Sequence, residues 1–184
     1  MESKPMPTMR YLSSPQHQAR WAGFFWLLVF LMGSVSLAFR NTTTGFVLDK
    51  TASVCYIVVS ILFFYLLRPI NKTMSLTAAL FGVSGCIVSL FGLAATIYIQ
   101  SLVFFGGHCF ILGYLIFRSM YLPKIVGALM MFAGVGWLTF IHPEFARSLN
   151  PFNMIPGMLG EGVLILWLLI KGLDMNAWES LTNK

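Results

Sequence analysis

The stretch TMSLTAALFGVSGCIVSLFGLAATIYIQSLVFFGG, residues 73–107, contains no charged side chain and no histidine. A helix needs roughly 20 mostly apolar residues to cross a bilayer, so this stretch is long enough for two crossings. The only polar interruption where a hairpin fits is YIQS, Tyr98–Ser101. The stretch therefore predicts two adjacent transmembrane helices and, with them, a membrane protein.

The composition of the whole chain agrees with that prediction. Of its 184 residues, 58% are hydrophobic and 10% are charged, and the mean hydropathy is +0.80. A soluble domain carries about 25% charged residues. The strands of a transmembrane barrel would alternate apolar and polar residues, whereas these runs are continuously apolar. We predict an all-α, polytopic integral membrane protein.

Six apolar runs are long enough to be membrane spans. The first is longer than the apolar part of a cleaved signal peptide, so we expect it to be retained. The connections contain turn-forming residues or proline, and no separate soluble domain fits in them. We therefore divide the chain into an N-terminal segment (1–20), a six-helix transmembrane domain (21–172) and a C-terminal tail (173–184). The predicted spans are Trp21–Phe39, Ala52–Leu67, Met74–Ile99, Ser101–Phe117, Ile125–Ile141 and Met154–Ile170.

The basic residues predict the orientation of these spans. Loops on the cytoplasmic side of a membrane protein carry an excess of Lys and Arg. With six spans and a cytoplasmic N-terminus, nine of the 12 Lys and Arg residues fall inside, and the external side carries only Arg40, Lys50 and Arg147. We predict that both termini are cytoplasmic and that the 40–50 and 143–151 loops are external. The net charge of +6 is explained by this bias and does not indicate binding to nucleic acid.

Four of the cytoplasmic cations are expected to form a rim at the headgroup level, where long basic side chains reach phosphates. Pro69 and Pro123 should lie just beyond helix ends there. The rim residues are Arg68, Arg118, Lys124 and Lys171.

Two ionisable side chains, His108 and Glu161, lie well inside the predicted spans. Each follows the outer start of its span by about seven residues, which at 1.5 Å per residue places both roughly 10 Å below the outer boundary. Ionisable groups inside a membrane are costly and usually functional. We predict that His108 and Glu161 approach each other, directly or through water. Other polar residues of the same outer half would complete an outward-facing ligand pocket, namely Arg40, Tyr56 and Gln100, with Ser34 and Ser36 nearby.

Metal and haem sites are not expected. Cys55, Cys86 and Cys109 all lie in apolar runs without metal-binding spacing, where cysteine behaves as a small hydrophobic residue. A haem held by two histidines would need a second histidine inside the membrane, but His17 is terminal and His142 is interfacial. We therefore expect no cofactor.

Several segments resemble one membrane-protein family. ARWAGFFWLL (Ala19–Leu28), LLRPINK (Leu66–Lys72), FFGGHCFILGYLIFRSMYLPKIVG (Phe104–Gly127) and GEGVLILWLLIKG (Gly160–Gly172) are similar to the bacterial multi-pass family called domain of unknown function 4386. The resemblance implies several membrane spans, a bacterial inner-membrane location and no particular activity. The family's recurrent positions match His108, Gly113, Arg118, Pro123 and Glu161. The hairpin near Gln100 is shorter than in the family.

Three functions agree with these features. The first is binding or transport of a small polar or amphiphilic ligand, for which so short a chain would be expected to form a homo-oligomer. The second is a membrane-embedded enzyme acting on a lipid or isoprenoid, with Glu161 as general acid and His108 as base or orienting group. The third is a structural or accessory subunit. Each of the three has the lipid bilayer as its surroundings.

Overall fold

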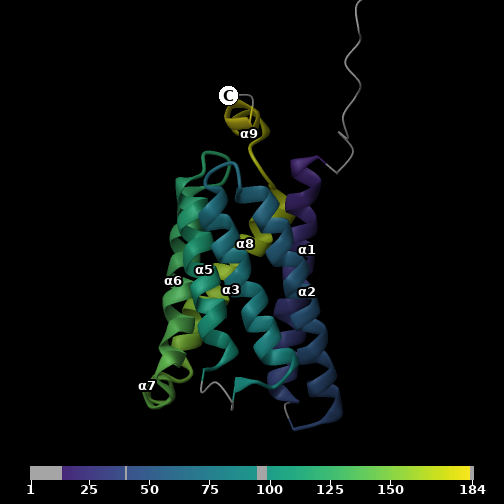
Figure 1. Ribbon diagram of the computed structural model, residues 1–184, viewed down its shortest axis with the longest axis vertical. Coiled ribbons are helices and arrows are strands. Elements are labelled where there is room, and N and C mark those ends of the chain that lie inside the picture. Colours follow the sequence, from purple (N-terminus) through teal and green to yellow (C-terminus); the bar gives the residue numbers. More distant parts are fainter. Residues whose placement is uncertain (1–13, 40, 95–98, 183–184) are drawn as a thin grey trace, which may run out of the picture.

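Six long apolar helices make up the body of the protein. The computed structural model describes residues 14–39, 41–94 and 99–182, and this part contains helices and no strands. Six of these helices are long and apolar enough to cross a membrane, which confirms the predicted fold class. They are α1 (Pro15–Ala38), α2 (Thr43–Leu67), α3 (Lys72–Leu90), α5 (Ser101–Arg118), α6 (Lys124–Leu138), whose span continues to Ile141, and α8 (Ile155–Ile170), whose span begins at Phe152 (Figure 1).

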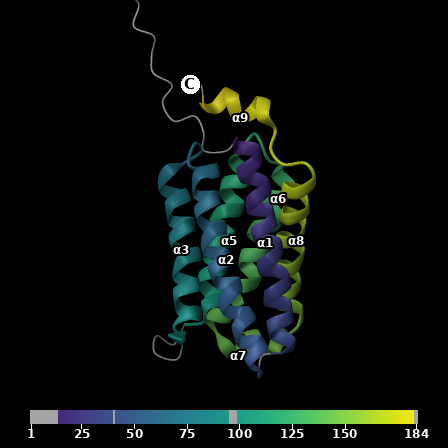
Figure 2. The same cartoon turned by 90° about the vertical axis from the view of Figure 1, so that its right-hand side faces the viewer.

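The six helices form a closed ring. Each packs on the next along the chain, and α8 packs on α1 as well as on α6. The helices run alternately up and down, so α1 begins and α8 ends at the same end of the bundle (Figures 1 and 2). Short connections between antiparallel neighbours produce this arrangement. Its consequence is that side chains from all six helices can meet in the interior.

Short helices cover the two ends of the bundle. The connection between α6 and α8 contains η1 (Thr139–Ile141), α7 (Pro143–Leu149) and η2 (Phe152–Met154). At the opposite end, α9 (Met175–Thr182) follows α8 (Figure 2). We call these the α7 end and the α9 end.

The predicted C-terminal tail is thus largely helical and docked on the bundle. The ring of Trp178 in α9 lies 4.9 Å from that of Tyr121 in the α5–α6 connection, in an edge-to-face arrangement. Tyr121 Oη donates to the carbonyl oxygen of Leu66 at 2.7 Å, near the end of α2 where helix carbonyls lack helical partners. Burial of this phenol raises the pKa of Tyr121 above its ordinary value. Tyr121 therefore joins α2 to α9.

The prediction that residues 40–50 form a loop was wrong, because α2 begins at Thr43. The hydroxyl of Thr42 accepts a hydrogen bond from the Gly45 N–H at 3.1 Å and caps the helix. The second span is therefore longer than predicted. Asp49 and Lys50 lie on its second turn instead of in a loop.

The third span is shorter than predicted, because α3 ends at Leu90 and not near Ile99. Gly92 adopts φ 64°, a conformation that favours glycine. The Leu93 N–H donates to the Val88 carbonyl oxygen at 3.0 Å, as in a Schellman motif that terminates a helix. The hairpin that we predicted at Tyr98–Ser101 falls partly in residues 95–98, outside the described residues.

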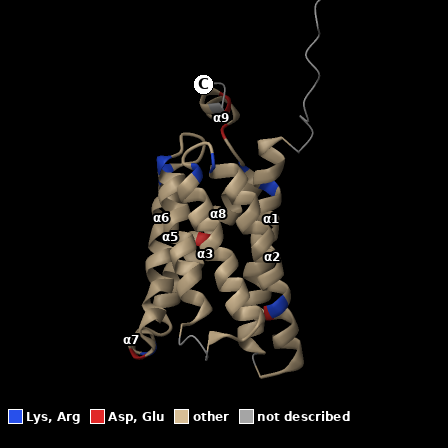
Figure 3. Cartoon of the chain, in the orientation of Figure 1, with Lys and Arg blue, Asp and Glu red and all other residues tan. Residues whose placement is uncertain are grey.

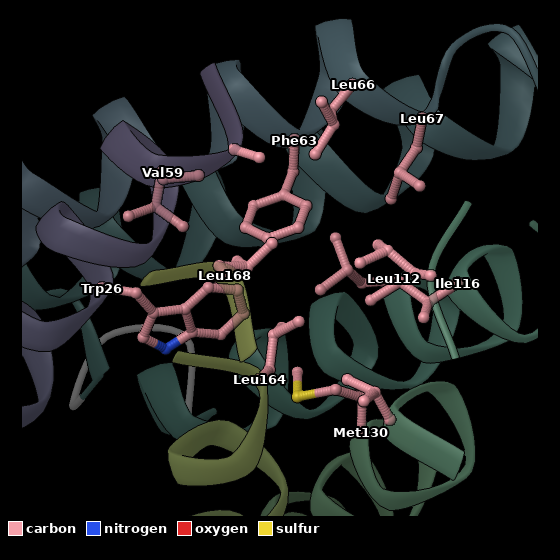
Figure 4. Packing of buried hydrophobic residues seen from close by; sticks show 14 of the residues in the cluster. Trp26, Val59, Phe63, Leu66, Leu67, Leu112, Ile116, Met130, Leu164 and Leu168 are labelled. Carbon is pink, nitrogen blue, oxygen red and sulfur yellow. The ribbon is translucent and has the colours of Figure 1, made fainter. Parts of the chain in front are cut away.

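The interior of the half nearer the α9 end is filled by large apolar side chains (Figure 4). Trp26, Phe63, Leu112 and Leu168 are almost completely buried there, together with further aliphatic residues of α2, α5 and α8. Large apolar side chains also cover the outside, among them Leu166 with 58% exposure. That outer surface suits contact with lipid, and dense interior packing holds such bundles together.

Glycines bring α5 and α6 into backbone contact. A Cβ atom added at Gly113 would lie 2.7 Å from the carbonyl oxygen of Gly127, and one added at Gly134 would lie 2.8 Å from that of Gly106. Small residues permit this close approach. Gly127 and Gly134 therefore both serve helix packing.

Most described cations lie at the α9 end (Figure 3). Arg68 is the C-cap of α2, Arg118 ends α5, Lys124 begins α6 and Lys171 is the C-cap of α8. Arg68 lies over the ring of Tyr65 at 5.0 Å and Lys124 over that of Phe117 at 6.0 Å.

The two prolines agree with the predicted helix ends. Pro69 directly follows the C-cap of α2, and Pro123 is the N-cap of α6. The position of these ends relative to the two faces of a membrane stays a prediction.

Candidate functional site

The carboxylate of Glu161 is held by two tryptophans from other helices. Trp137 Nε1–H of α6 donates to Glu161 Oε1 at 2.7 Å, and Trp26 Nε1–H of α1 donates to Oε2 at 3.1 Å. The Cys109 thiol of α5 lies 3.8 Å from Oε1. Indole nitrogens only donate and carboxylate oxygens accept, so each oxygen has a suitable partner. Glu161 is 9% exposed.

A glycine one turn before Glu161 makes room for one of these indoles. A Cβ atom added at Gly157 would lie 2.5 Å from a ring carbon of Trp137 and 2.8 Å from its Nε1. The sequence Gly-x-x-x-Glu on α8 therefore places the carboxylate and the space for its donor on one helix face.

His108 does not hydrogen-bond to Glu161, so the predicted direct pairing was wrong. His108 Nδ1 lies 2.8 Å from the carbonyl oxygen of Ala78 in α3. Since a carbonyl only accepts, Nδ1 carries the proton there. His108 Nε2 is buried and has no partner among the described residues. A contact through water stays a prediction.

The two ionisable side chains nevertheless belong to one cluster, because Trp26 contacts both of them. The imidazole of His108 lies 6.0 Å from the Trp26 ring, whose N–H binds Glu161. It also lies 5.3 Å from the ring of Tyr56. His108 and Glu161 thus share a contact with Trp26, while the hydrogen bond of His108 goes to α3.

A cavity of about 240 Å³ extends from Glu161 towards the α7 end. Its apolar walls include Val29, Phe30, Phe105, Trp137 and Met158. Polar side chains come from α1, α2, α3, α5 and α8; they are Ser34, Ser36, Asp49, Ser53, Tyr56, Ser89, Ser101 and Glu161. The cavity is therefore amphiphilic and ends at a buried carboxylate.

Tyr56 presents a nearly buried hydroxyl at this cavity. The residue is 4% exposed, and its ring packs against that of Phe105 at 4.6 Å between centroids. Its Oη lies 3.9 Å from Cys109 Sγ, a long contact for a hydroxyl. This hydroxyl can therefore donate to or accept from a molecule in the cavity.

Of the residues predicted to form the pocket, Tyr56 and Glu161 line the cavity, as do Ser34 and Ser36. His108 is fully buried behind it, and Gln100 is exposed at the start of α5. Neither His108 nor Gln100 belongs to the lining. Arg40 lies outside the described residues.

The sequence analysis missed a second acid at the cavity, Asp49. Its Oδ2 accepts from Ser89 Oγ at 3.0 Å and pairs with Lys50 Nζ at 3.3 Å. Lys50 Nζ also donates to the carbonyl oxygen of Ser89. These bonds connect α2 to α3. Reading Thr42 as an N-cap, a standard signal for a helix start, would have placed Asp49 on the helix.

The sequence analysis also missed Trp26 and Trp137, because an aromatic residue in an apolar span is normally interpreted as a packing residue. A buried tryptophan usually finds an acceptor for its N–H. With so few carboxylates inside the spans, Glu161 was the acceptor that this rule would have suggested.

Comparison with known proteins gives the family. The profile described as "Domain of unknown function (DUF4386)" matches residues 35–103 and 93–172. The chain belongs to this family. The matched region contains Tyr56, His108, Trp137 and Glu161, whereas Trp26 precedes it.

One relative of this DUF4386 protein comes from an archaeon. An "Uncharacterized protein" of Archaeoglobus fulgidus is 32% identical over 124 residues, which cover 63% of this chain and 76% of the relative. Similarity to this chain is therefore found outside bacteria. No solved structure matches the chain.

Proposed function

We propose that this DUF4386 protein binds a small amphiphilic ligand in the cavity that ends at Glu161. The observation that carries the proposal is the combination of a buried carboxylate and apolar walls around one space of about 240 Å³. Sites for drug-sized ligands occupy about 300–1,000 Å³. The ligand is therefore smaller than most drugs.

The cost of burying Glu161 supports a functional role for it. Burying a carboxylate inside the membrane costs several kcal/mol of free energy, whereas burying a leucine in the same place carries no such cost. The indole bonds offset part of this cost, since hydrogen bonds to a charged group contribute about 1.5–3 kcal/mol each. A carboxylate that also receives a ligand gives a reason for keeping the arrangement.

The packing of the bundle suggests entry from the α7 end. The cavity is lined by the parts of the helices nearest that end, whereas the α9 half is filled by the apolar core. If the basic α9 end is cytoplasmic, the ligand enters from outside. Transport would require a second conformation in which that core opens, as alternating access does in known carriers.

The alternative of a lipid-acting enzyme receives less support from the geometry. A general base must reach its proton donor or substrate directly or through one water. His108 instead bonds to a backbone carbonyl of α3 and is not part of the cavity lining.

Two glycines provide a matched test of the binding proposal. A Cβ atom at Gly33, which lines the cavity, would meet nothing within 4 Å, and the same holds at Gly162 on α8, which does not line it. Gly33→Leu should fill the cavity and weaken binding of radiolabelled 2-phenylethanol or 2-phenylethylamine, measured in nanodiscs, at least tenfold. Gly162→Leu should leave binding unchanged. Equal effects of the two variants, or binding of neither probe, would contradict the proposal.

A further inference from the structure

We infer that the ligand is a small organic cation whose ammonium group faces Glu161. This inference rests on the proposed function, since it assigns a chemical class to the ligand of the same cavity. It predicts selection by charge among molecules of equal size and shape.

The charges at the cavity favour a positive ligand. Its lining includes two carboxylates, Asp49 and Glu161, and no Lys or Arg among the described residues. Asp49 is already paired with Lys50. Glu161 has no cationic partner in the part of the chain that the structure describes; its bonds are to two neutral indoles and a thiol. An anionic ligand would meet repulsion here, and a cation would supply the missing counter-charge.

The indoles also leave the carboxylate able to accept more hydrogen bonds. A carboxylate has about four lone-pair positions on its two oxygens. One indole N–H occupies each oxygen, and the thiol contact to Oε1 is long at 3.8 Å. An ammonium N–H can take a remaining position, and such charge-assisted bonds are roughly twice as strong as neutral ones.

Aromatic residues share the cavity lining with Glu161. They are Trp137, which donates to the carboxylate, and Tyr56 and Phe105. The faces of such rings attract cations, by about 0.5–2 kcal/mol depending on exposure. The Tyr56 hydroxyl, with only its long contact to Cys109, offers another oxygen acceptor.

The rest of the cavity suits the apolar part of such a ligand. Val29, Phe30 and Met158 provide apolar surface towards the α7 end. Methionine adapts its shape to different contacts. The site therefore fits a compact amine with a short apolar body better than a highly polar cation.

Two probes of nearly the same shape test the inference. At neutral pH 2-phenylethylamine carries an ammonium group where 2-phenylethanol carries a hydroxyl. We expect the wild-type protein in nanodiscs to bind the amine at least tenfold more tightly than the alcohol. Glu161→Gln should reduce amine binding to the level of the alcohol while alcohol binding persists, which also shows that the variant is folded. Glu144→Gln makes the same chemical change on exposed α7, outside the cavity lining, and should alter neither affinity.

The outcomes separate this inference from the proposed function. If both probes bind equally and Gly33→Leu abolishes the binding of both, the binding proposal stands but the inference that the ligand is a cation is wrong. If neither probe responds to Gly33→Leu, both proposals fail. The wild-type comparison decides the question of charge even if the Glu161 variant does not fold.

Discussion

Glu161 has two indole donors on different oxygens, and this pattern decides how its replacements behave. The amide of glutamine has one oxygen and one NH₂ group, so in place of Glu161 it can accept from one indole only. The other indole N–H would then face a second donor. Glu161→Gln therefore removes a charge and also leaves a buried donor without an acceptor, which costs about 1–3 kcal/mol.

A double-mutant cycle with Trp137→Phe measures this interaction. Phenylalanine keeps an aromatic ring beside Gly157 but has no N–H for Glu161 Oε1. We expect the losses in unfolding free energy from Trp137→Phe and Glu161→Gln to be non-additive by about 1.5–3 kcal/mol, because both remove the same charge-assisted bond. Reversible unfolding in mild detergent gives the four free energies.

Trp167→Phe is the control for that cycle. Trp167 Nε1–H donates to the carbonyl oxygen of Gly172 and, among the described residues, shares no hydrogen-bond partner with Glu161. Its effect should add to that of Glu161→Gln. Additivity for Trp137 as well would mean that the 2.7 Å bond contributes nothing to stability.

Sequence reasoning gave the positions of His108 and Glu161 along their spans but did not identify their partners, and the reason is geometric. Position along a span gives depth at 1.5 Å per residue. The direction of a side chain depends on helix rotation, which the packing of neighbouring helices sets. Gly82 provides the example: a Cβ atom there would lie 2.8 Å from His108 Nδ1. The absence of that atom lets α3 come close enough for the Ala78 carbonyl to bind His108.

The ends of the elements were predicted least well, since hydropathy does not record where a helix is capped. The N-cap Thr42 sets the start of α2 before the apolar run of the second span begins. Gly92, with its positive φ, follows the end of α3 although the apolar run of the third span continues. Both signals were present in the sequence as local chemistry, and long apolar runs concealed them. The shift at α2 matters most for the site, because it brings Asp49 to the cavity.

Glycines at the α5–α6 contact should be intolerant of any side chain. A Cβ atom at Gly134 would lie 2.6 Å from the backbone nitrogen of Phe110, and backbone cannot move aside as a flexible side chain does. Gly134→Ala should therefore destabilise the bundle by about 1–3 kcal/mol, the usual cost of overpacking. Thermal or denaturant unfolding in nanodiscs is the measurement.

Gly162→Ala is the matched control for Gly134→Ala. Both glycines lie inside helices, but the added methyl group at Gly162 meets nothing within 4 Å. Alanine there should be neutral or stabilise the helix by about 0.5–1 kcal/mol. A similar loss of stability in both variants would show that crowding is not the cause.

For the whole molecule, the number of spans and the distribution of Lys and Arg were enough to predict the fold class. The cavity could be found only from the three-dimensional structure. Six apolar runs and an even number of crossings followed from composition and from the positions of Lys and Arg. The ring closed by α1 and α8 could not be read from the sequence, because helix-to-helix contacts leave no periodic signal when every face is apolar. That closure is what brings Trp26 of the first helix to Glu161 of the last.

The membrane orientation of this ring is a prediction of the charge distribution. Of the described cations, Arg20, Arg68, Lys72, Arg118, Lys124 and Lys171 belong to the half nearer the α9 end, against Lys50 and Arg147 in the other half. Such a bias predicts that the α9 end lies in the cytoplasm.

Cysteines introduced at opposite ends test this orientation. Ser148 of α7 and Ser180 of α9 are both exposed, so substitution there should not disturb packing. In intact cells, a membrane-impermeant maleimide should label Ser148→Cys and should label Ser180→Cys only after permeabilisation. The parent protein, whose Cys55, Cys86 and Cys109 all lie within spans, gives the background. Labelling of Ser180→Cys alone in intact cells would show that the bundle has the opposite orientation. The mouth of the cavity would then lie in the cytoplasm, and the ligand would enter from inside the cell.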